Sequence, residues 1–247
     1  MARGPGLSLS ITRMAFPGGG AALFQGFDLT VPPGQTVALI GPSGVGKTTL
    51  LRILAGTEQG FDGQALVDGQ PAPEAPVPGL VFQDARLLPW LTCAGNLTLV
   101  QPALDAAGVE RTLARVGLAG HADSWPRQLS GGMQRRLGLA RALAVNPRLL
   151  LLDEPFVSLD RAVVRDLQAL LADLIAASGP TVVLVSHDPE DAARLAHRAV
   201  LIGGRPVRIL ADLDLTQIAD PAPQTRTRAQ IAALVDHIEA AALQVTP

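Results

Sequence analysis

The 247-residue sequence has one cysteine, no tyrosine and one lysine among its 20 basic residues. The single cysteine, Cys93, excludes a disulfide framework and any metal site built from several cysteines. A net charge of −2 without a basic run argues against general binding to duplex nucleic acid, which needs many cations on one face. Since every other basic residue is arginine, the position of Lys47 is informative.

Long apolar runs are missing as well. The continuous apolar stretches at 149–152 and 182–185 have the length of strands, far below the roughly 20 residues that a membrane-spanning helix needs. Residues 1–6 contain no apolar core of a signal peptide. We therefore expect a cytoplasmic protein that reaches a membrane only through a partner.

The apolar pattern that is present predicts an α/β fold. Alternation at 7–11 and 27–31 predicts two antiparallel strands joined through the glycine-rich turn 18–20. Four continuous apolar runs predict strands covered on both faces, at 37–40, 80–82, 149–152 and 182–185. Helices are expected at 46–55, 161–177, 189–196 and 227–243.

Two further segments stand out between these elements. From 83 to 145 the strand signal disappears and helical spacing takes over, which predicts an inserted helical lobe. Four prolines make 69–79 a predicted loop. The last helix carries an apolar stripe that we expect to pack on the core rather than bind an effector, formed by Ile231, Leu234, Val235, Ile238 and Leu243.

Residues 41–48 match the phosphate-loop pattern G-x-x-x-x-G-K-[ST] between a predicted strand and a predicted helix. In such a loop, glycines turn backbone N–H groups toward phosphates, Lys47 reaches the β- and γ-phosphates, and the Thr48 hydroxyl can bind Mg²⁺. A glycine-rich turn that binds nothing is the alternative, and the complete motif disfavours it. The predicted ATP-binding residues here are Gly41, Pro42, Ser43, Gly44, Val45, Gly46, Lys47, Thr48 and Thr49.

A second acidic signal follows the apolar run at 149–152. A buried strand would deliver Asp153 at its carboxyl end, where it can hold Mg²⁺ through water. Glu154 is then placed to polarise an attacking water. Alone, a strand that ends in Asp-Glu more often enters an acidic turn, but about a hundred residues after a phosphate loop it indicates a nucleotide site.

The segment 129–134 reads Leu-Ser-Gly-Gly-Met-Gln. Together with Gln83, Asp-Glu-Pro at 153–155, Ser-Leu-Asp at 158–160 and His187, it makes residues 7–215 resemble the ATP-binding subunits of ABC transporters. The resemblance implies a single ATP-binding domain over 1–247 with a P-loop NTPase core. In this α/β core, a mixed sheet is flanked by helices and carries an N-terminal antiparallel layer.

The resemblance also divides the chain. It implies that the core comprises 7–85 and 146–215, that a helical signature subdomain occupies 86–145, and that 216–247 is a C-terminal helical extension. It further implies a homodimer that forms on ATP binding. In that dimer, a helix expected to begin near Met133 faces ATP bound to the other subunit. The residues implied to contact ATP across the dimer are Ser130, Gly131, Gly132, Gln134 and Asp160.

Roles in hydrolysis follow from the same resemblance. Glu154 would be the general base, and His187 would contact the γ-phosphate and hold the water and Glu154 in position. Gln83 would bind Mg²⁺ and the attacking water, so the implied metal ligands are Thr48, Gln83 and Asp153. The other histidines, at 121, 197 and 237, are expected to be solvated residues.

One departure concerns adenine. The family usually stacks the base on a tyrosine near the first strand, and this sequence has none. Phe16 stands at about that place and offers the same π-face. The alternative is that Phe16 is a packing residue and that the base binds more loosely.

The stretch 81–96 resembles importers of nitrate, sulfonates, taurine and related compounds, including pyrimidine precursors of thiamine, which commonly carry Leu-Leu-Pro-Trp after the glutamine. This implies two permease subunits, a periplasmic binding protein, and a place on the cytoplasmic face of the bacterial inner membrane. Leu87, Leu88 and Trp90 are too apolar for a solvated loop, so they either pack inside the lobe or receive a short helix of the permease.

Three other classes share the motifs. An exporter or lipoprotein-extraction ATPase has the same catalytic residues, and only 83–96 argues against it. A DNA-repair type of soluble ABC ATPase carries long coiled coils, and no heptad run of that length is present. Translation-associated relatives carry two nucleotide-binding domains, whereas this sequence has one phosphate loop and one signature.

Overall fold

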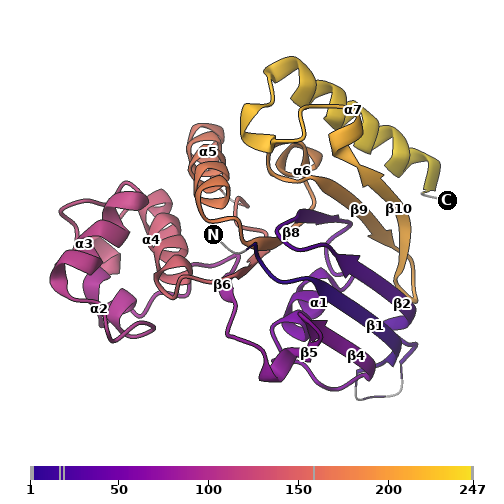
Figure 1. Ribbon diagram of the computed structural model, residues 1–247, viewed down its shortest axis with the longest axis horizontal. Coiled ribbons are helices and arrows are strands. Elements are labelled where there is room, and N and C mark those ends of the chain that lie inside the picture. Colours follow the sequence, from indigo (N-terminus) through magenta and orange to yellow (C-terminus); the bar gives the residue numbers. More distant parts are fainter. Residues whose placement is uncertain (1–2, 17, 19, 158, 246–247) are drawn as a thin grey trace.

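The computed structural model describes residues 3–16, 18, 20–157 and 159–245, and its centre is a six-stranded sheet (Figure 1). The strand order is β10-β9-β3-β8-β7-β6, in which β10 alone runs antiparallel to its neighbour. The strands are β3 (Thr36–Ile40), β6 (Gly79–Val81), β7 (Leu149–Asp153), β8 (Thr181–Ser186), β9 (Arg198–Gly203) and β10 (Arg208–Asp214). The four predicted apolar strands are therefore confirmed, β6 one residue earlier than expected, whereas β9 and β10 were not predicted.

A second sheet is antiparallel, with the order β2-β1-β4-β5. Its strands are β1 (Leu7–Met14), β2 (Phe24–Val31), β4 (Asp62–Val67) and β5 (Gln70–Pro71). The predicted pairing of the first two is confirmed, with Leu9 opposite Leu29; in the predicted turn, Gly19 lies outside the described residues. The expectation of a loop at 69–79 was wrong in part, because this segment contains β5 and the short 3-10 helix η1 (Ala72–Glu74).

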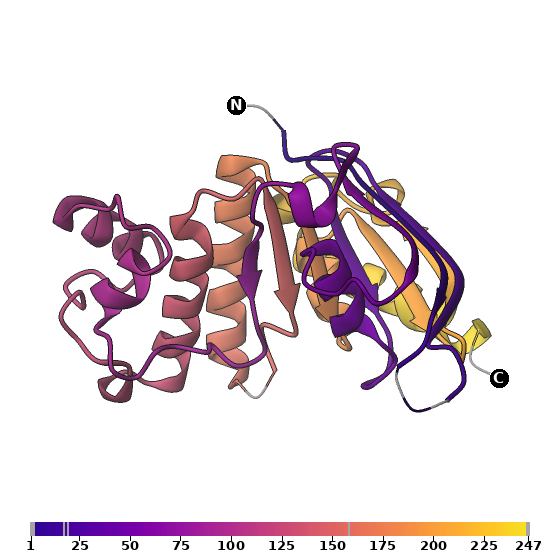
Figure 2. The same cartoon turned by 90° about the horizontal axis from the view of Figure 1, so that it is seen from below.

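Helix α1 (Lys47–Leu54) packs between the two sheets. Side chains alternate along each central strand, so Val37 and Leu39 face the core around α1, while Ala38 and Ile40 face a second core on the other side. Figure 2 shows the antiparallel sheet as an outer layer on the α1 side. Burial on both faces is the reason that these strands read as unbroken apolar runs.

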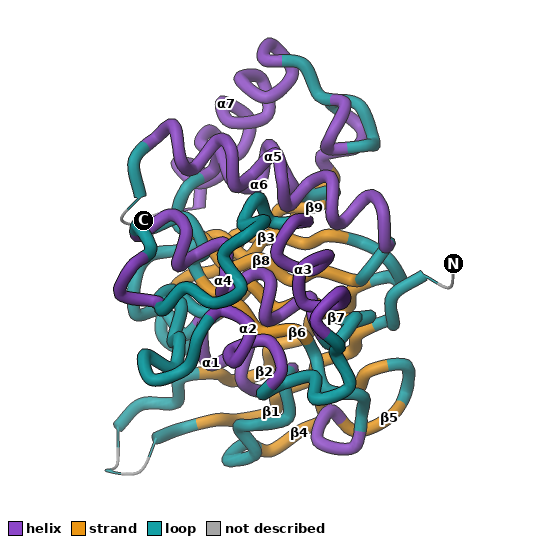
Figure 3. Tube along the Cα trace, turned by 90° about the vertical axis from the view of Figure 1, so that its left-hand side faces the viewer, coloured by secondary structure: helices purple, strands orange, loops and turns teal. Residues whose placement is uncertain are grey.

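The helical lobe lies at one end of the six-stranded sheet, on the left in Figure 1. It contains α2 (Cys93–Thr98), α3 (Ala106–Arg115), the 3-10 helix η2 (Pro126–Gln128) and α4 (Gly131–Ala144). Leu97, Leu113 and Leu137, one from each α-helix, are fully buried and form its core. Seen from that end, the lobe lies in front of the strands, with α5 (Arg161–Ser178) beside it (Figure 3).

The chain ends with α6 (Pro189–Leu195) and, after β10, the 3-10 helices η3 (Leu215–Gln217) and η4 (Pro223–Thr225) and then α7 (Arg228–Val245). Helix α7 packs on α6 and β10, where Leu234 and Ile238 are fully buried. Leu243, expected on the same stripe, is 80% exposed, so that part of the prediction was wrong. Among the described residues, no helix has the length and apolar character needed to cross a membrane.

Candidate active site

The phosphate loop connects the end of β3 to the start of α1. Gly46 precedes the helix with φ of 114°, a left-handed conformation that favours glycine. At Gly41 a Cβ atom would lie 2.5 Å from the carbonyl oxygen of Ile202, so a larger residue does not fit. Lys47 is only 4% exposed, and its Nζ donates to the carbonyl oxygens of Gly41 at 2.8 Å and Pro42 at 3.0 Å. The side chain of the one lysine in the sequence therefore crosses the phosphate loop and is held by its backbone carbonyls.

Asp153, the last residue of β7, lies beside the first turn of α1. Thr48 Oγ1 donates to Asp153 Oδ1 at 3.1 Å. Burial raises the pKa of Asp153 above its ordinary value, and the charge of Glu154 adds to this, while the Thr48 hydrogen bond and Lys47 act in the opposite direction. Hydroxyl and carboxylate oxygens are ligands that suit Mg²⁺. The oxygens of Thr48 and Asp153 are therefore donors that fit Mg²⁺. Among the described residues, no group of three or more His, Cys, Asp or Glu side chains could hold a metal ion.

Glu154 lies between the phosphate loop and His187. Its Oε1 is 3.4 Å from Lys47 Nζ and its Oε2 is 3.5 Å from His187 Nδ1. The Glu154 N–H donates to the carbonyl of Val185 at 3.0 Å, and its φ of 46° is left-handed, which is strained for a residue with a Cβ. The side chain is 15% exposed and that of His187 is 52% exposed. The structure thus brings three predicted site residues together, with Lys47 and His187 both close to the carboxylate of Glu154.

The other predicted residues of this chain's own site are more open. Gln83 follows β6 by two residues and is exposed. Phe16 follows β1 and is 56% exposed, so it is not a packing residue in this structure. Asp160 is exposed just before α5 and makes no capping hydrogen bond to it. Ser158, which belongs to the Ser-Leu-Asp motif, lies outside the described residues.

The signature segment forms the start of α4. Ser130 is the N-cap, and its Oγ accepts from the backbone N–H of Met133 at 3.3 Å. The helix begins at Gly131, two residues before the expected Met133, because the two glycines already have helical conformations. Gln134 uses its amide within the lobe, where Nε2 donates to the carbonyls of Pro126 at 3.1 Å and Leu129 at 3.2 Å. This side chain shapes the loop before the helix.

Asn96 organises the apolar loop after Gln83, and sequence reasoning missed it. Asn96 is fully buried in α2 and its Oδ1 accepts from the Leu88 N–H at 2.9 Å. Its Nδ2 donates to three carbonyls, those of Leu88 at 3.2 Å, Leu91 at 3.2 Å and Thr92 at 3.0 Å. This network folds 88–92 into a compact turn that leaves Trp90 67% exposed. Leu88 is half-buried in that turn.

Two arginines of α4 donate hydrogen bonds to backbone carbonyls of the loops that follow β6 and β7. For Arg135 the sequence offered one signal, the Arg-Arg pair at 135–136, and for Arg141 it offered none. Arg135 donates to the carbonyl of Phe82 at 3.4 Å and to that of Val157 at 3.3 Å. Arg141 donates to the carbonyls of Ala85 at 2.9 Å and Arg86 at 2.8 Å. The signature helix is thereby connected to the segments that carry Gln83 and Glu154.

His197 corrects one expectation. It is half-buried rather than solvated, and its Nδ1 accepts from the backbone N–H of Thr36 at 3.0 Å. Burial lowers the pKa of His197 below its ordinary value, and the nearby Arg226 cation lowers it further. This burial arises from tertiary structure, because the hydrogen bond joins the residue shortly after α6 to the first residue of β3.

The fold and this geometry define a P-loop nucleoside triphosphatase. A family model described as ABC transporter matches residues 24–157. The sequence is 42% identical over 202 residues to an aliphatic sulfonates import ATP-binding protein of Agrobacterium fabrum, covering 81% of this chain and 77% of that protein. A protein of the same description from Ralstonia nicotianae is 42% identical over 238 residues, covering 94% and 81%.

Solved structures agree with these relatives. A dimeric post-hydrolysis state of an ATP-binding cassette bound to ADP and Pi has a TM-score of 0.74 and 27% identity, covering 84% of this chain and 98% of that chain. A dimeric bacterial ABC transporter cassette gives the same values. The chain therefore belongs to the ABC transporter family, of which it is an ATP-hydrolysing subunit.

Proposed function

We propose that this protein is the ATP-binding and ATP-hydrolysing subunit of an importer for aliphatic sulfonates or a related small anion. The observation that carries the hydrolytic part is the placement of Glu154 between Lys47 and His187, beside the contact of Thr48 with Asp153. The sulfonate part rests on relatives that are 42–44% identical over most of the chain and bear that description.

In this proposal, the phosphate loop and Lys47 bind the phosphates of ATP, and Phe16 stacks on adenine. Glu154 takes a proton from the attacking water. The water oxygen bonds to the γ-phosphorus while the bond from that phosphorus to the bridging oxygen breaks, so ADP and phosphate leave. His187 and Gln83 orient the water. Mg²⁺, held by Thr48, Asp153 and Gln83, would offset the negative charge of the phosphates.

The proposal requires a second copy of this chain. The helix N-terminus at Lys47 belongs to the core and the one at Gly131 belongs to the lobe, so the chain has two separate anion-binding ends (Figure 1). A head-to-tail dimer would bring Ser130, Gly131, Gly132 and Asp160 of one copy to the phosphates bound by the other. The two solved structures described above are both dimeric.

Permease subunits would dock on the lobe. A groove of about 550 Å³ is lined by Leu87 and Pro89 and by Pro126 and Arg127, among other residues. The exposed indole of Trp90 lies next to this groove in the chain, which suits an anchor for a short helix of a membrane partner. In this role the protein is peripheral on the cytoplasmic face of the inner membrane.

Glu154→Gln tests the hydrolytic part. The amide cannot accept the proton, so we expect ATP binding to persist and turnover to fall by about 10²- to 10⁴-fold, measured as phosphate release. ATP should then trap the variant as a dimer in size-exclusion chromatography, and adding Ser130→Arg should abolish that dimer. Near-normal turnover by Glu154→Gln would remove Glu154 from the role of general base.

Reconstitution tests the substrate. The subunit is placed in liposomes with its permease and binding protein, and ATPase activity is measured with ethanesulfonate, taurine, nitrate and a thiamine pyrimidine precursor. We expect the largest stimulation by an alkanesulfonate. Stimulation by none of them, with intact basal activity, would overturn the substrate class and leave the ATPase assignment standing.

A further inference from the structure

A buried hydrogen-bond network lies directly behind His187. Ser186, the last residue of β8, is 1% exposed, and its Oγ accepts from the N–H of Asp188 at 3.0 Å. The same hydroxyl donates to Asp191 Oδ2 at 2.5 Å. The backbone N–H that follows His187 is therefore held by the hydroxyl of the residue before it, and that hydroxyl is in turn oriented by one carboxylate.

Asp191 is an unusual residue to bury. It is 5% exposed in α6, and no cation forms an ion pair with it among the residues that the structure describes. Burial raises the pKa of this carboxyl to about 6, with Asp188 adding to the shift while the hydrogen bonds from Ser186 and Gln168 and the charge of His187 oppose it. A buried carboxylate without a cation lowers stability, so its presence indicates a positional role.

Gln168 links this carboxylate to another part of the site. It is 4% exposed on α5, and its Nε2 donates to Asp191 Oδ1 at 2.7 Å. Its Oε1 has no hydrogen-bond partner among the described residues, so the side chain is oriented by Asp191 alone. Helix α5 begins at Arg161, immediately after Asp160. The network thus joins the helix that follows Asp160 to the loop that carries His187.

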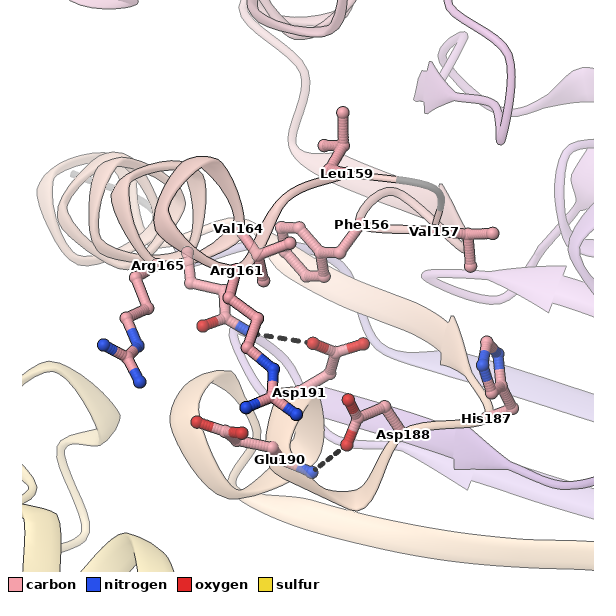
Figure 4. Close-up of a pocket in the computed structure, with 11 residues that line it drawn as sticks. Phe156, Val157, Leu159, Arg161, Val164, Arg165, His187, Asp188, Glu190 and Asp191 are labelled. Carbon is pink, nitrogen blue, oxygen red and sulfur yellow. Dashed lines mark hydrogen bonds between the residues drawn. The ribbon is translucent and has the colours of Figure 1, made fainter. Parts of the chain in front are cut away.

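Figure 4 shows the part of this network that lines a cavity of about 400 Å³. Asp191 receives its dashed bond from α5, while His187 points away from the network at the far side of the cavity. The network therefore does not touch the reacting groups itself. It holds the backbone from which His187 extends to within 3.5 Å of Glu154.

We propose that Asp191, bonded to Ser186 and Gln168, is a positioning residue that sets His187 against Glu154 during ATP hydrolysis. This inference rests on the proposed role of His187. Removing the carboxylate leaves the Ser186 hydroxyl free to rotate, so the peptide at Asp188 loses its fixed acceptor and His187 loses its orientation. ATP binding by the phosphate loop does not depend on this network.

The experiment measures kcat and KM for ATP, and the thermal midpoint, in Asp191→Leu, which removes the acceptor, in Ser186→Ala and in the control Glu190→Gln. Glu190 lies on the same helix and is bonded to Arg194 at the surface. We expect kcat to fall about 10- to 100-fold in the first two variants with KM within about twofold of wild type, and no change in the control. An unchanged kcat in Asp191→Leu would overturn the inference, as would a loss that appears only in KM.

A double-mutant cycle separates positioning from a general structural role. Asp191→Leu is combined with His187→Gln, and single-turnover rates are followed over hours so that slow hydrolysis is measured. If Asp191 acts through His187, the double variant hydrolyses ATP no more slowly than His187→Gln alone. Multiplicative losses would overturn the inference. If His187→Gln hydrolysis is too slow to measure, hydrogen exchange decides: an Asp188 amide as protected in Asp191→Leu as in wild type would also overturn the inference. Wild-type turnover by His187→Gln would instead refute the proposed role of His187.

Discussion

Replacing Asn96 with alanine tests how the exposed loop around Trp90 is built. The substitution removes four hydrogen bonds at a residue that is fully buried. At about 1 kcal/mol net for each bond, the loss is about 4 kcal/mol if the freed backbone groups stay dry. Since Leu88, Leu91 and Thr92 are half-buried, water can reach part of them, and we expect a loss of about 2 to 4 kcal/mol.

Hydrogen exchange locates this loss. The Leu88 N–H donates directly to Asn96, so its exchange should become about 30- to 700-fold faster in Asn96→Ala, the rate ratio that corresponds to 2 to 4 kcal/mol. The matched control is Thr98→Val on the same helix, which removes only the bonds from Thr98 Oγ1 to the carbonyls of Ala94 and Gly95 within that helix and should change little. Equal exchange of the Leu88 amide in the two variants would refute the assignment of the loop to Asn96.

Three further predictions concern other parts of the molecule. Trp90→Ala should reduce co-purification with the permease, whereas Val77→Ala, at an apolar residue that is 78% exposed outside the lobe, should not; equal effects of the two variants would remove Trp90 from the interface. Phe16→Ala should weaken ATP binding by about 1 kcal/mol, or roughly fivefold, in calorimetry, and unchanged affinity would rule out stacking. Asp191 binds its proton more tightly in the folded state than in the unfolded chain, so its ionisation lowers stability as pH rises from about 4 through about 6. The free energy of unfolding of Asp191→Asn relative to wild type should therefore increase by about 2 kcal/mol between pH 4.5 and 7.5, measured by denaturant titration, and a flat difference would contradict the raised pKa.

Most of the fold was predictable because its signals are local. Strands buried on both faces carry unbroken apolar runs, as in β3, β7 and β8, and the phosphate loop needs glycine where φ is positive and the backbone is close to Ile202. Strands β4 and β5 were missed because glycines, polar residues and a proline interrupt their pattern. The start of α4 was misplaced because glycine is a poor indicator of helix.

The sequence by itself determined the chemical identity of the site, since each motif carries its own residue types at a fixed place on a strand end or helix start. Only the tertiary structure decided how those residues are held. The contacts of Glu154 with Lys47 and His187 join segments that are far apart in the chain, and no periodicity reports them. Buried polar side chains such as Asn96 and Asp191 look like surface residues in sequence, because their hydrogen-bond partners exist only once the chain has folded.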